Sequence, residues 1–220
     1  MIWFSLVESV GEGAFLHGAE LVLRLPEREA VVCRADEIKL MGRHNLANLL
    51  AACALAGAAG APVEAMRRVA VSFPGVEHRL ELVRERHEVR WYNDSIATTP
   101  ERAAAALQAF EAPVVLLAGG RDKHLPWGEM AALTQRKVRH LILFGEAAGL
   151  IEQAMQMAER TERVCEIHQA GTLEGAVELA ARLAQPGDVV LLSPGGTSFD
   201  AYRDFVARGG HFRKLVQALE

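Results

Sequence analysis

The chain has 220 residues, half of them hydrophobic, which is enough to bury a core in one large domain or in two smaller ones. It carries 28 acidic and 24 basic residues, giving a formal net charge of −4, and no basic block that suits a nucleic-acid backbone. No run approaches the roughly 20 apolar residues of a membrane span, residues 1–10 lack the basic start of a signal peptide, and three scattered cysteines fit a reducing compartment. We therefore expect a globular cytoplasmic protein with no nucleic-acid partner and no membrane span.

The first part of the chain is predicted to form short strands followed by a helix pair. Apolar pieces separated by Gly, Pro and charged residues predict strands at residues 2–7, 13–16, 20–25 and 30–33. An Ala- and Leu-rich stretch predicts a helix over residues 45–59, and a second helix follows over residues 62–71 until Phe73-Pro74-Gly75 ends it. We place a domain boundary near residues 75–78, which separates a first domain, 1–77, from a second, 78–220.

Beyond the boundary, strand-like runs alternate with amphipathic windows. Strands are predicted at residues 80–83, 89–92, 114–118, 140–144, 164–168 and 189–192. Helices are predicted at residues 100–110, 127–135, 147–158, 172–183 and 199–219. Because the run at 114–118 is apolar on both faces, it fits a parallel sheet that is covered on both sides. The fold class is therefore α/β, with a Rossmann-like, doubly wound and mostly parallel sheet in the second domain.

Three unusually polar turns follow predicted strands, at residues 93–100, 119–123 and 193–200. In an open parallel sheet, ligands bind beyond the carboxyl ends of the strands, so these turns are the candidate site. Lys123 could neutralise a ligand carboxylate, while the hydroxyls of Thr98 and Ser198 could orient the ligand. Asp94 would instead favour a cation or a metal-bound phosphate. The set predicts a pocket for a small acid with several charges.

Each turn also has a simpler explanation. Asp94-Ser95 and Thr98-Thr99 are common helix-capping residues. The paired glycines at 119–120 and 195–196 suit ordinary turns, and a single lysine is usually a solvated surface cation. Their shared placement at strand ends favours the functional interpretation.

Asn45 and Asn48 open the first predicted helix and lie three residues apart, on one helical face. Two carboxamides can pair with the edge of a purine, although Asn45 could equally be a helix cap. Near the boundary, His78-Arg79 could reach a phosphate or a ribose, or could simply belong to a linker.

Several familiar motifs are absent from the sequence. It contains no G-x-x-x-x-G-K-[ST] phosphate loop, no H-E-x-x-H and no G-x-S-x-G. The eight histidines show no metal-ligand spacing. We therefore assign no catalytic residue and no metal ligand from the residues alone.

Taken in order, five motifs make the sequence resemble the Mur ligase family, in its D-glutamate-adding branch. They are GRHNLAN at 42–48, GVEHRLE at 75–81, NDSIAT at 93–98, GGRDK at 119–123 and LSPGGTSFD at 192–200, and Arg208-Gly209 follows them. The resemblance spans nearly the whole chain. It implies that residues 1–77 are the end of the family's central ATPase domain and that residues 78–220 are its C-terminal, amino-acid-binding domain.

The resemblance implies an ADP-forming ligase of peptidoglycan synthesis that uses ATP and Mg²⁺. ATP would phosphorylate the carboxylate of UDP-N-acetylmuramoyl-L-alanine, and the amino group of D-glutamate would attack the resulting acyl phosphate. By position, Asn45 and Asn48 would contact adenine, and Arg79 and Asp94 would lie on the ribose and phosphate side. D-glutamate would be held by Thr98, Lys123, Ser198 and Phe205.

Two features depart from the family pattern. Ile96 occupies a position where many members have lysine. The family's phosphate loop, Mg²⁺ ligands, carbamylated lysine and UDP-sugar domain would all lie before Met1, in a missing N-terminal half, so the chain alone is expected to be inactive. Two alternatives stay open: a non-catalytic module that binds an acidic ligand, and a related amide ligase that adds another amino acid, such as a folylpolyglutamate synthase or another Mur enzyme.

Overall fold

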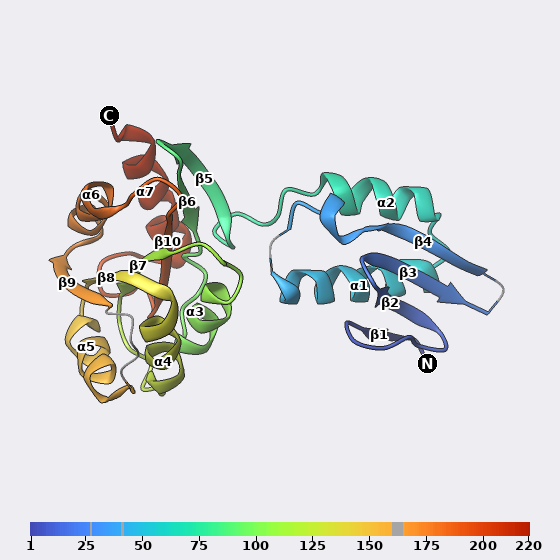
Figure 1. Ribbon diagram of the computed structural model, residues 1–220, viewed down its shortest axis with the longest axis horizontal. Helices are drawn as coiled ribbons and strands as arrows, with labels where there is room; N and C mark the ends of the chain where they lie inside the picture. The colour runs from blue at the N-terminus through green and yellow to red at the C-terminus, as the bar shows by residue number, and fades with distance from the viewer. Residues whose placement is uncertain (27, 41, 160–164) are drawn as a thin grey trace. The chain divides into compact units, whose positions relative to one another are not determined.

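The computed structural model describes residues 1–26, 28–40, 42–159 and 165–220. The chain divides into two compact units, Met1–Gly75 and Val76–Glu220 (Figure 1). Each unit has its own sheet.

The first unit is a four-stranded sheet with two helices packed against it. The strands lie in the order β1-β2-β3-β4, in which β1 and β2 are parallel and the other pairs are antiparallel. The elements are β1 (Trp3–Ser5), β2 (Gly13–His17), β3 (Glu20–Leu25), β4 (Arg28–Arg34), a 3-10 turn η1 (Ala35–Glu37), α1 (Arg43–Ala58) and α2 (Val63–Ser72).

The core of this unit lies between the sheet and the two helices. Leu21 and Leu23 of β3 are fully buried, and they share one hydrophobic cluster with Leu50 of α1 and Met66 of α2. Gly57 allows α1 to approach the sheet closely, because a Cβ atom there would lie 2.8 Å from a methyl carbon of Leu23. Helix and sheet therefore pack at a distance that a larger side chain would increase.

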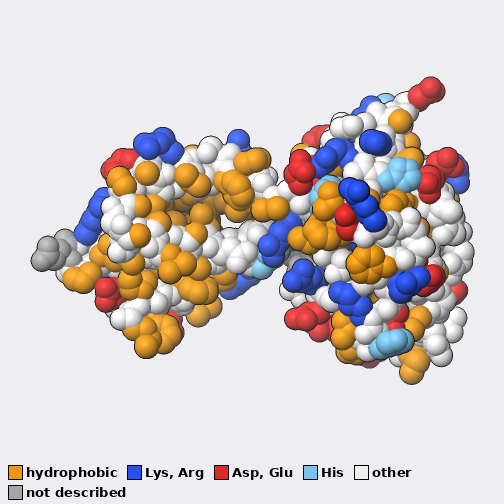
Figure 2. All heavy atoms as spheres, turned by 180° about the vertical axis from the view of Figure 1, so that it is seen from behind, with side chains coloured by type: hydrophobic (Ala, Val, Ile, Leu, Met, Phe, Trp, Pro, Cys, Tyr) orange, Lys and Arg blue, Asp and Glu red, His pale blue; other side chains and the backbone are white. Residues whose placement is uncertain are grey.

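Large apolar side chains are also exposed on the first unit. Figure 2 shows hydrophobic side chains at many places on the surface drawn there. The most exposed on this unit include Val7, Leu55, Val69 and Trp3. Its apolar residues are thus divided between a core and the surface.

The second unit is built on a six-stranded sheet in the order β5-β6-β10-β7-β8-β9. Only the β5–β6 pair is antiparallel, and the remaining strands run parallel. The strands are β5 (Glu81–Arg86), β6 (Val89–Asn93), β7 (Val114–Gly119), β8 (Val138–Phe144), β9 (Glu166–Gly171) and β10 (Val189–Gly195).

Helices cover both faces of this sheet (Figure 1). They are α3 (Pro100–Leu107), α4 (Gly128–Lys137), α5 (Ala148–Met157), α6 (Leu173–Leu183) and α7 (Phe205–Ala218). Apolar residues of α6 and α7, such as Val177 and Phe212, form one core with Val115, Leu117 and Ile142 of the sheet. Helices α3, α4 and α5 lie on the opposite face. Every residue of β7 is buried, as both-face coverage requires.

A tight turn makes the edge strand β5 antiparallel to β6. His87 and Glu88 join β5 to β6 and have φ angles of 50° and 61°. A two-residue turn with positive φ at both positions matches the right-handed twist of a hairpin, so β5 returns directly as β6.

The doubly wound, mostly parallel sheet is confirmed, and most predicted elements occur within a few residues of the expected bounds. Three bounds were wrong or only partly described. The first strand covers only Trp3–Ser5, and the last helix begins at Phe205 instead of residue 199. The strand predicted at 164–168 corresponds to β9, which covers Glu166–Gly171, and the first predicted position, Val164, lies outside the described residues. Within the described ranges, no helix is long and apolar enough to cross a membrane.

Candidate functional site

The three polar turns follow neighbouring strands of the second unit. In the sheet, β10 lies between β6 and β7, and the turns begin at the carboxyl ends of these strands, at Asn93, Gly119 and Gly195. Residues 93–100, 119–123 and 193–200 therefore lie together at one end of the sheet, although they are distant in the sequence. We call these three segments the crevice loops.

Backbone hydrogen bonds join the crevice loops to one another. The amide of Gly195 donates to the carbonyl of Ala97 at 2.9 Å. Arg121 and Thr197 form a short antiparallel bridge, in which each amide donates to the other residue's carbonyl at 2.9 and 2.8 Å. The three loops therefore hold one another in place before any ligand binds.

The paired glycines at the end of β7, Gly119 and Gly120, are required by this close approach. Gly120 has φ +91°, and a Cβ atom there would lie 2.2 Å from the carbonyl oxygen of Thr197. At Gly119, with φ +153°, a Cβ atom would lie 1.8 Å from the carbonyl oxygen of Phe144. Only glycine allows the backbone to pass through both positions.

A buried arginine ties two of the loops together. Arg208 of α7 is fully buried, and its guanidinium donates to the Ser95 hydroxyl and carbonyl and to the carbonyls of Gly196 and Thr197, at 2.9–3.2 Å. Burial lowers the pKa of Arg208 to about 10, so the group stays charged at neutral pH. The planar guanidinium supplies donors to the carbonyls of Ser95 and Gly196, and it adds a second hydrogen bond to the carbonyl of Thr197.

Lys123 and Thr98 meet within the crevice loops. The ammonium of Lys123 is exposed and donates to the hydroxyl of half-buried Thr98 at 3.2 Å. Asp122 shapes the loop around this lysine, because its carboxylate accepts from the indole N–H of Trp127 at 3.0 Å and from the amide of His124 at 2.8 Å. The pair places a cation and a hydroxyl side by side, as recognition of a carboxylate requires.

Ser198 lies within the crevice loops, and Phe205 lies next to them; both residues accept hydrogen bonds at their backbone carbonyls. Ser198 is buried in the loop after β10, where its carbonyl accepts from Tyr202 at 2.7 Å. Phe205 is the first residue of α7, and its carbonyl accepts from the Ser95 hydroxyl at 2.8 Å. The structure thus brings Thr98 into contact with Lys123. Of the other two residues, Ser198 is part of the crevice loops and Phe205 is attached to them through Ser95.

Asp94 is a buried carboxyl group at the base of the crevice loops. It is only 4% exposed, and its two oxygens accept from the Ser193 hydroxyl at 2.8 Å and from the Leu80 amide at 3.2 Å. Burial raises its pKa to about 7, although these two hydrogen bonds favour the ionised form. A carboxyl group that changes charge near neutral pH is typical of functional sites.

The segment beside Asp94 has an unusual backbone. His78 and Leu80 have positive φ angles of 63° and 46°, and exposed Arg79 lies between them. Buried His78 contacts the side-chain amide of Asn93 at 2.9 Å, and its ring meets Phe205 edge-on at 6.2 Å. The amide of Leu80 donates to the carboxylate of Asp94, so buried neighbours fix the backbone conformation that presents Arg79. Positive φ angles held in this way are typical of functional sites.

Asn45 and Asn48 lie in the first turns of α1, in the first unit. Asn45 is buried, Asn48 is exposed, and the amide nitrogen of Asn48 donates to the side-chain oxygen of Asn45 at 3.4 Å. The two carboxamides therefore share one helical face, and together they present both donors and acceptors.

Sequence reasoning assigned no individual role to Arg208, Asp122 or Trp127, although Asp122 lies in the turn at 119–123 that it singled out. A signal for Arg208 was present, because Arg208, Phe212 and Val216 recur every four residues and all face the core. An arginine in an otherwise apolar stripe predicts a buried cation with specific partners. The contact between Asp122 and Trp127 has no comparable signal, since it depends on the path of the loop.

The fold and the convergent loops define an α/β domain with candidate ligand-binding residues at the carboxyl ends of its parallel strands. The sequence assigns this domain to a family. The family described as "Mur ligase, glutamate ligase domain" matches residues 78–196. This chain belongs to the Mur ligase family.

Curated relatives agree with this membership. The chain is 48% identical to the UDP-N-acetylmuramoylalanine–D-glutamate ligase of Symbiobacterium thermophilum, over 94% of this chain and 45% of that protein. It is 42% identical to the ligase of the same name from Clostridium botulinum, over 98% of this chain and 46% of that protein. It thus spans about half the length of the curated relatives it matches.

Two solved structures share the fold. The UDP-N-acetylmuramate–alanine ligase of Thermotoga maritima superposes with a TM-score of 0.66 at 17% identity, over 98% of this chain and 47% of that one. E. coli FolC, in a complex with ADP, superposes with a TM-score of 0.64 at 18% identity, over 94% of this chain and 47% of that one.

Proposed function

We propose that this chain supplies the amino-acid-binding part of a ligase that adds D-glutamate to UDP-N-acetylmuramoyl-L-alanine. Two curated relatives that carry this name are 48% and 42% identical to nearly the whole chain. The observation that carries the proposal is the contact between Lys123 and Thr98, at the edge where three loops converge. Its chemistry suits a dicarboxylic amino acid.

Each residue of the proposed D-glutamate site has a distinct task. The ammonium of Lys123 pairs with one carboxylate of D-glutamate. The hydroxyls of Thr98 and Ser198 orient the ligand by neutral hydrogen bonds, and Phe205 packs against its carbon chain. Arg208 does not touch the ligand in this scheme. It positions the loops on both sides of the site.

The nucleotide contacts form a second part of the proposal. When bound, ATP with Mg²⁺ supplies the phosphoryl group that activates the carboxylate of the sugar-linked substrate. The paired carboxamides of Asn45 and Asn48 fit the donor and acceptor edge of adenine. Arg79 offers an exposed cation for the ribose and phosphate side. Because both oxygens of Asp94 accept hydrogen bonds from the protein, we assign it the task of holding the segment that presents Arg79.

Calorimetry with D-glutamate tests the amino-acid site directly. We expect the chain to bind D-glutamate and Lys123→Ala to lower the affinity at least about tenfold, because a hydrogen bond to a charged group contributes roughly 1.5–3 kcal/mol. Lys214→Ala, at an exposed lysine on α7, is the matched control and should bind like the parent chain.

Selectivity decides between this proposal and a ligase for another amino acid. Heat with lysine or diaminopimelate and none with D-glutamate would contradict the D-glutamate assignment. Equal D-glutamate affinity in the parent chain and in Lys123→Ala would remove Lys123 from the site.

A further inference from the structure

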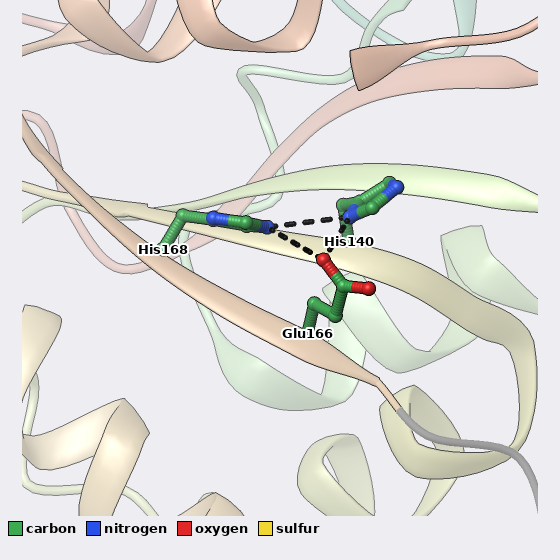
Figure 3. A group of neighbouring side chains, drawn as sticks. All are labelled: His140, Glu166 and His168. Atoms are coloured by element: carbon green, nitrogen blue, oxygen red, sulfur yellow. Dashed lines mark hydrogen bonds and ion pairs between the residues drawn. The ribbon is translucent and has the colours of Figure 1, made fainter.

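Two histidines and a glutamate converge on the second unit, away from the crevice loops. His140 lies near the start of β8, and Glu166 and His168 lie at the start of β9. The parallel ladder pairs His140 with Glu166 and Ile142 with His168. Because side chains two residues apart in a strand share a face, all three project from the same face and point toward one another (Figure 3).

The three candidate ligand atoms, which contact one another by a hydrogen bond and ion pairs, lie at separations close to those of a tetrahedral metal site. Nδ1 of His140 lies 3.2 Å from Nε2 of His168 and 3.4 Å from a carboxylate oxygen of Glu166, and that oxygen lies 3.7 Å from Nε2 of His168. Ligands about 2.0–2.1 Å from a tetrahedral ion are roughly 3.3 Å apart, whereas neighbouring ligands in an octahedron are only about 2.9 Å apart. The observed triangle matches the tetrahedral case better.

Burial and ligand type narrow the choice of ion. The His140 side chain is 9% exposed, that of His168 25% and that of Glu166 61%, so solvent reaches the group from the Glu166 side. Two imidazoles and one carboxylate suit zinc and its neighbours among the transition metals. Mg²⁺ and Ca²⁺ prefer sites built from oxygen atoms.

The position in the fold separates this group from the proposed substrate site. His140, Glu166 and His168 lie toward the amino ends of β8 and β9, whereas the crevice loops follow the carboxyl ends of β6, β7 and β10. An ion here would link the edge strand β9 to its neighbour β8. We propose that His140, Glu166 and His168 form a binding site for a divalent transition-metal ion of the zinc type, with a fourth position open to solvent.

Zinc titration of the whole chain, stripped of metal by a chelator, tests the proposal. We expect one Zn²⁺ per chain by equilibrium dialysis, and a thermal transition that moves upward with added Zn²⁺. His168→Gln and Glu166→Gln should each weaken binding at least about tenfold, since the loss of even an outer-shell partner costs about 10–100-fold. His140→Gln should do the same, and circular dichroism checks that this more buried variant still folds.

The controls isolate the three ligands. His87→Asn removes an exposed histidine at the β5–β6 turn, where asparagine tolerates the positive φ, and should leave zinc binding unchanged. Co²⁺ in place of Zn²⁺ should give the strong visible absorption of a tetrahedral site, and excess Mg²⁺ should not displace it.

Three results would overturn the proposal. They are no zinc bound to the parent chain, zinc affinity unchanged in His168→Gln and Glu166→Gln, and equal competition by Mg²⁺. D-glutamate binding is expected to be the same with and without zinc, so the outcome here is independent of the proposed ligase function.

Discussion

At the scale of single residues, the crevice is organised by two buried ionisable groups, Asp94 and Arg208. Burial shifts both toward their neutral forms, raising the pKa of Asp94 to about 7 and lowering that of Arg208 to about 10. Hydrogen bonds offset part of this cost, because Asp94 accepts from Ser193 and Leu80 while Arg208 donates to loop carbonyls. Both groups order the crevice loops at some expense to stability, which is common at functional sites.

Asp94 should make the stability of the second unit depend on pH. Its pKa is raised from an ordinary value of 3.8 to about 7, so the folded chain holds the proton more tightly than the unfolded chain. The unfolding free energy should therefore fall as pH rises from about 4 to about 7. At about 1.4 kcal/mol for each pH unit between the two pKa values, the ionised carboxylate costs on the order of 4 kcal/mol above pH 7.

Asp94→Asn removes this charge and keeps the shape of the side chain. We expect a gain of roughly 1–3 kcal/mol at pH 8.5 and little change at pH 5, measured by urea unfolding through the fluorescence of buried Trp91 and Trp127. Glu101→Gln, at an exposed carboxylate on α3, should keep the parental pH profile. If Asp94→Asn and the parent chain showed the same profile, the raised pKa would be wrong.

At the scale of whole elements, the sequence predicted the α/β alternation well because it depends on local apolar runs. The end of β7, the turn after it and the start of α3 at Pro100 all follow from nearby Gly and Pro residues. The start of α7 was placed six residues too early, because the extended backbone and the N-cap at Asp204, whose carboxylate accepts from Ala207 at 2.7 Å, break an otherwise helical pattern.

Contacts between elements were less predictable than the elements themselves. The shared edge of the three turns followed from the rule that ligands bind at the carboxyl ends of parallel strands. The contact between His140 and His168 could not be predicted in this way, because it depends on the register between β8 and β9 and not on spacing along the chain. The role of Arg208 likewise depends on a contact between elements, because its partners lie on loops distant in the sequence from α7.

Helix α7 contains two adjacent glycines with different surroundings, which allows a matched comparison. A Cβ atom on Gly209 would lie 2.3 Å from Nδ1 of buried His78, whereas one on Gly210 would meet nothing within 4 Å. Gly210→Ala should therefore stabilise the chain by about 0.5–1 kcal/mol through helix propensity. Gly209→Ala should destabilise it by about 1–3 kcal/mol, because His78 must move away from Asn93. Thermal unfolding of the two variants measures both, and equal effects would contradict the close packing.

At the scale of the whole molecule, each unit contains its own sheet and its own hydrophobic core. All six strands of the larger sheet lie within Val76–Glu220. Arg208 and the loops that it joins lie there too. A unit of this kind is expected to fold cooperatively by itself, since its buried surface does not depend on strands supplied from elsewhere in the chain.

We therefore expect residues 76–220, produced alone, to fold and to keep the D-glutamate site. Thr98, Lys123, Ser198 and Phe205 all belong to this piece, so its affinity for D-glutamate should stay within about threefold of that of the whole chain, because a difference below roughly 0.6 kcal/mol leaves the contacts intact. Circular dichroism would establish folding and calorimetry the affinity, with Lys123→Ala in the same piece as the negative control. A folded piece that no longer binds D-glutamate would show that residues before Val76 are needed for the amino-acid site, and the assignment to the crevice loops would have to be withdrawn.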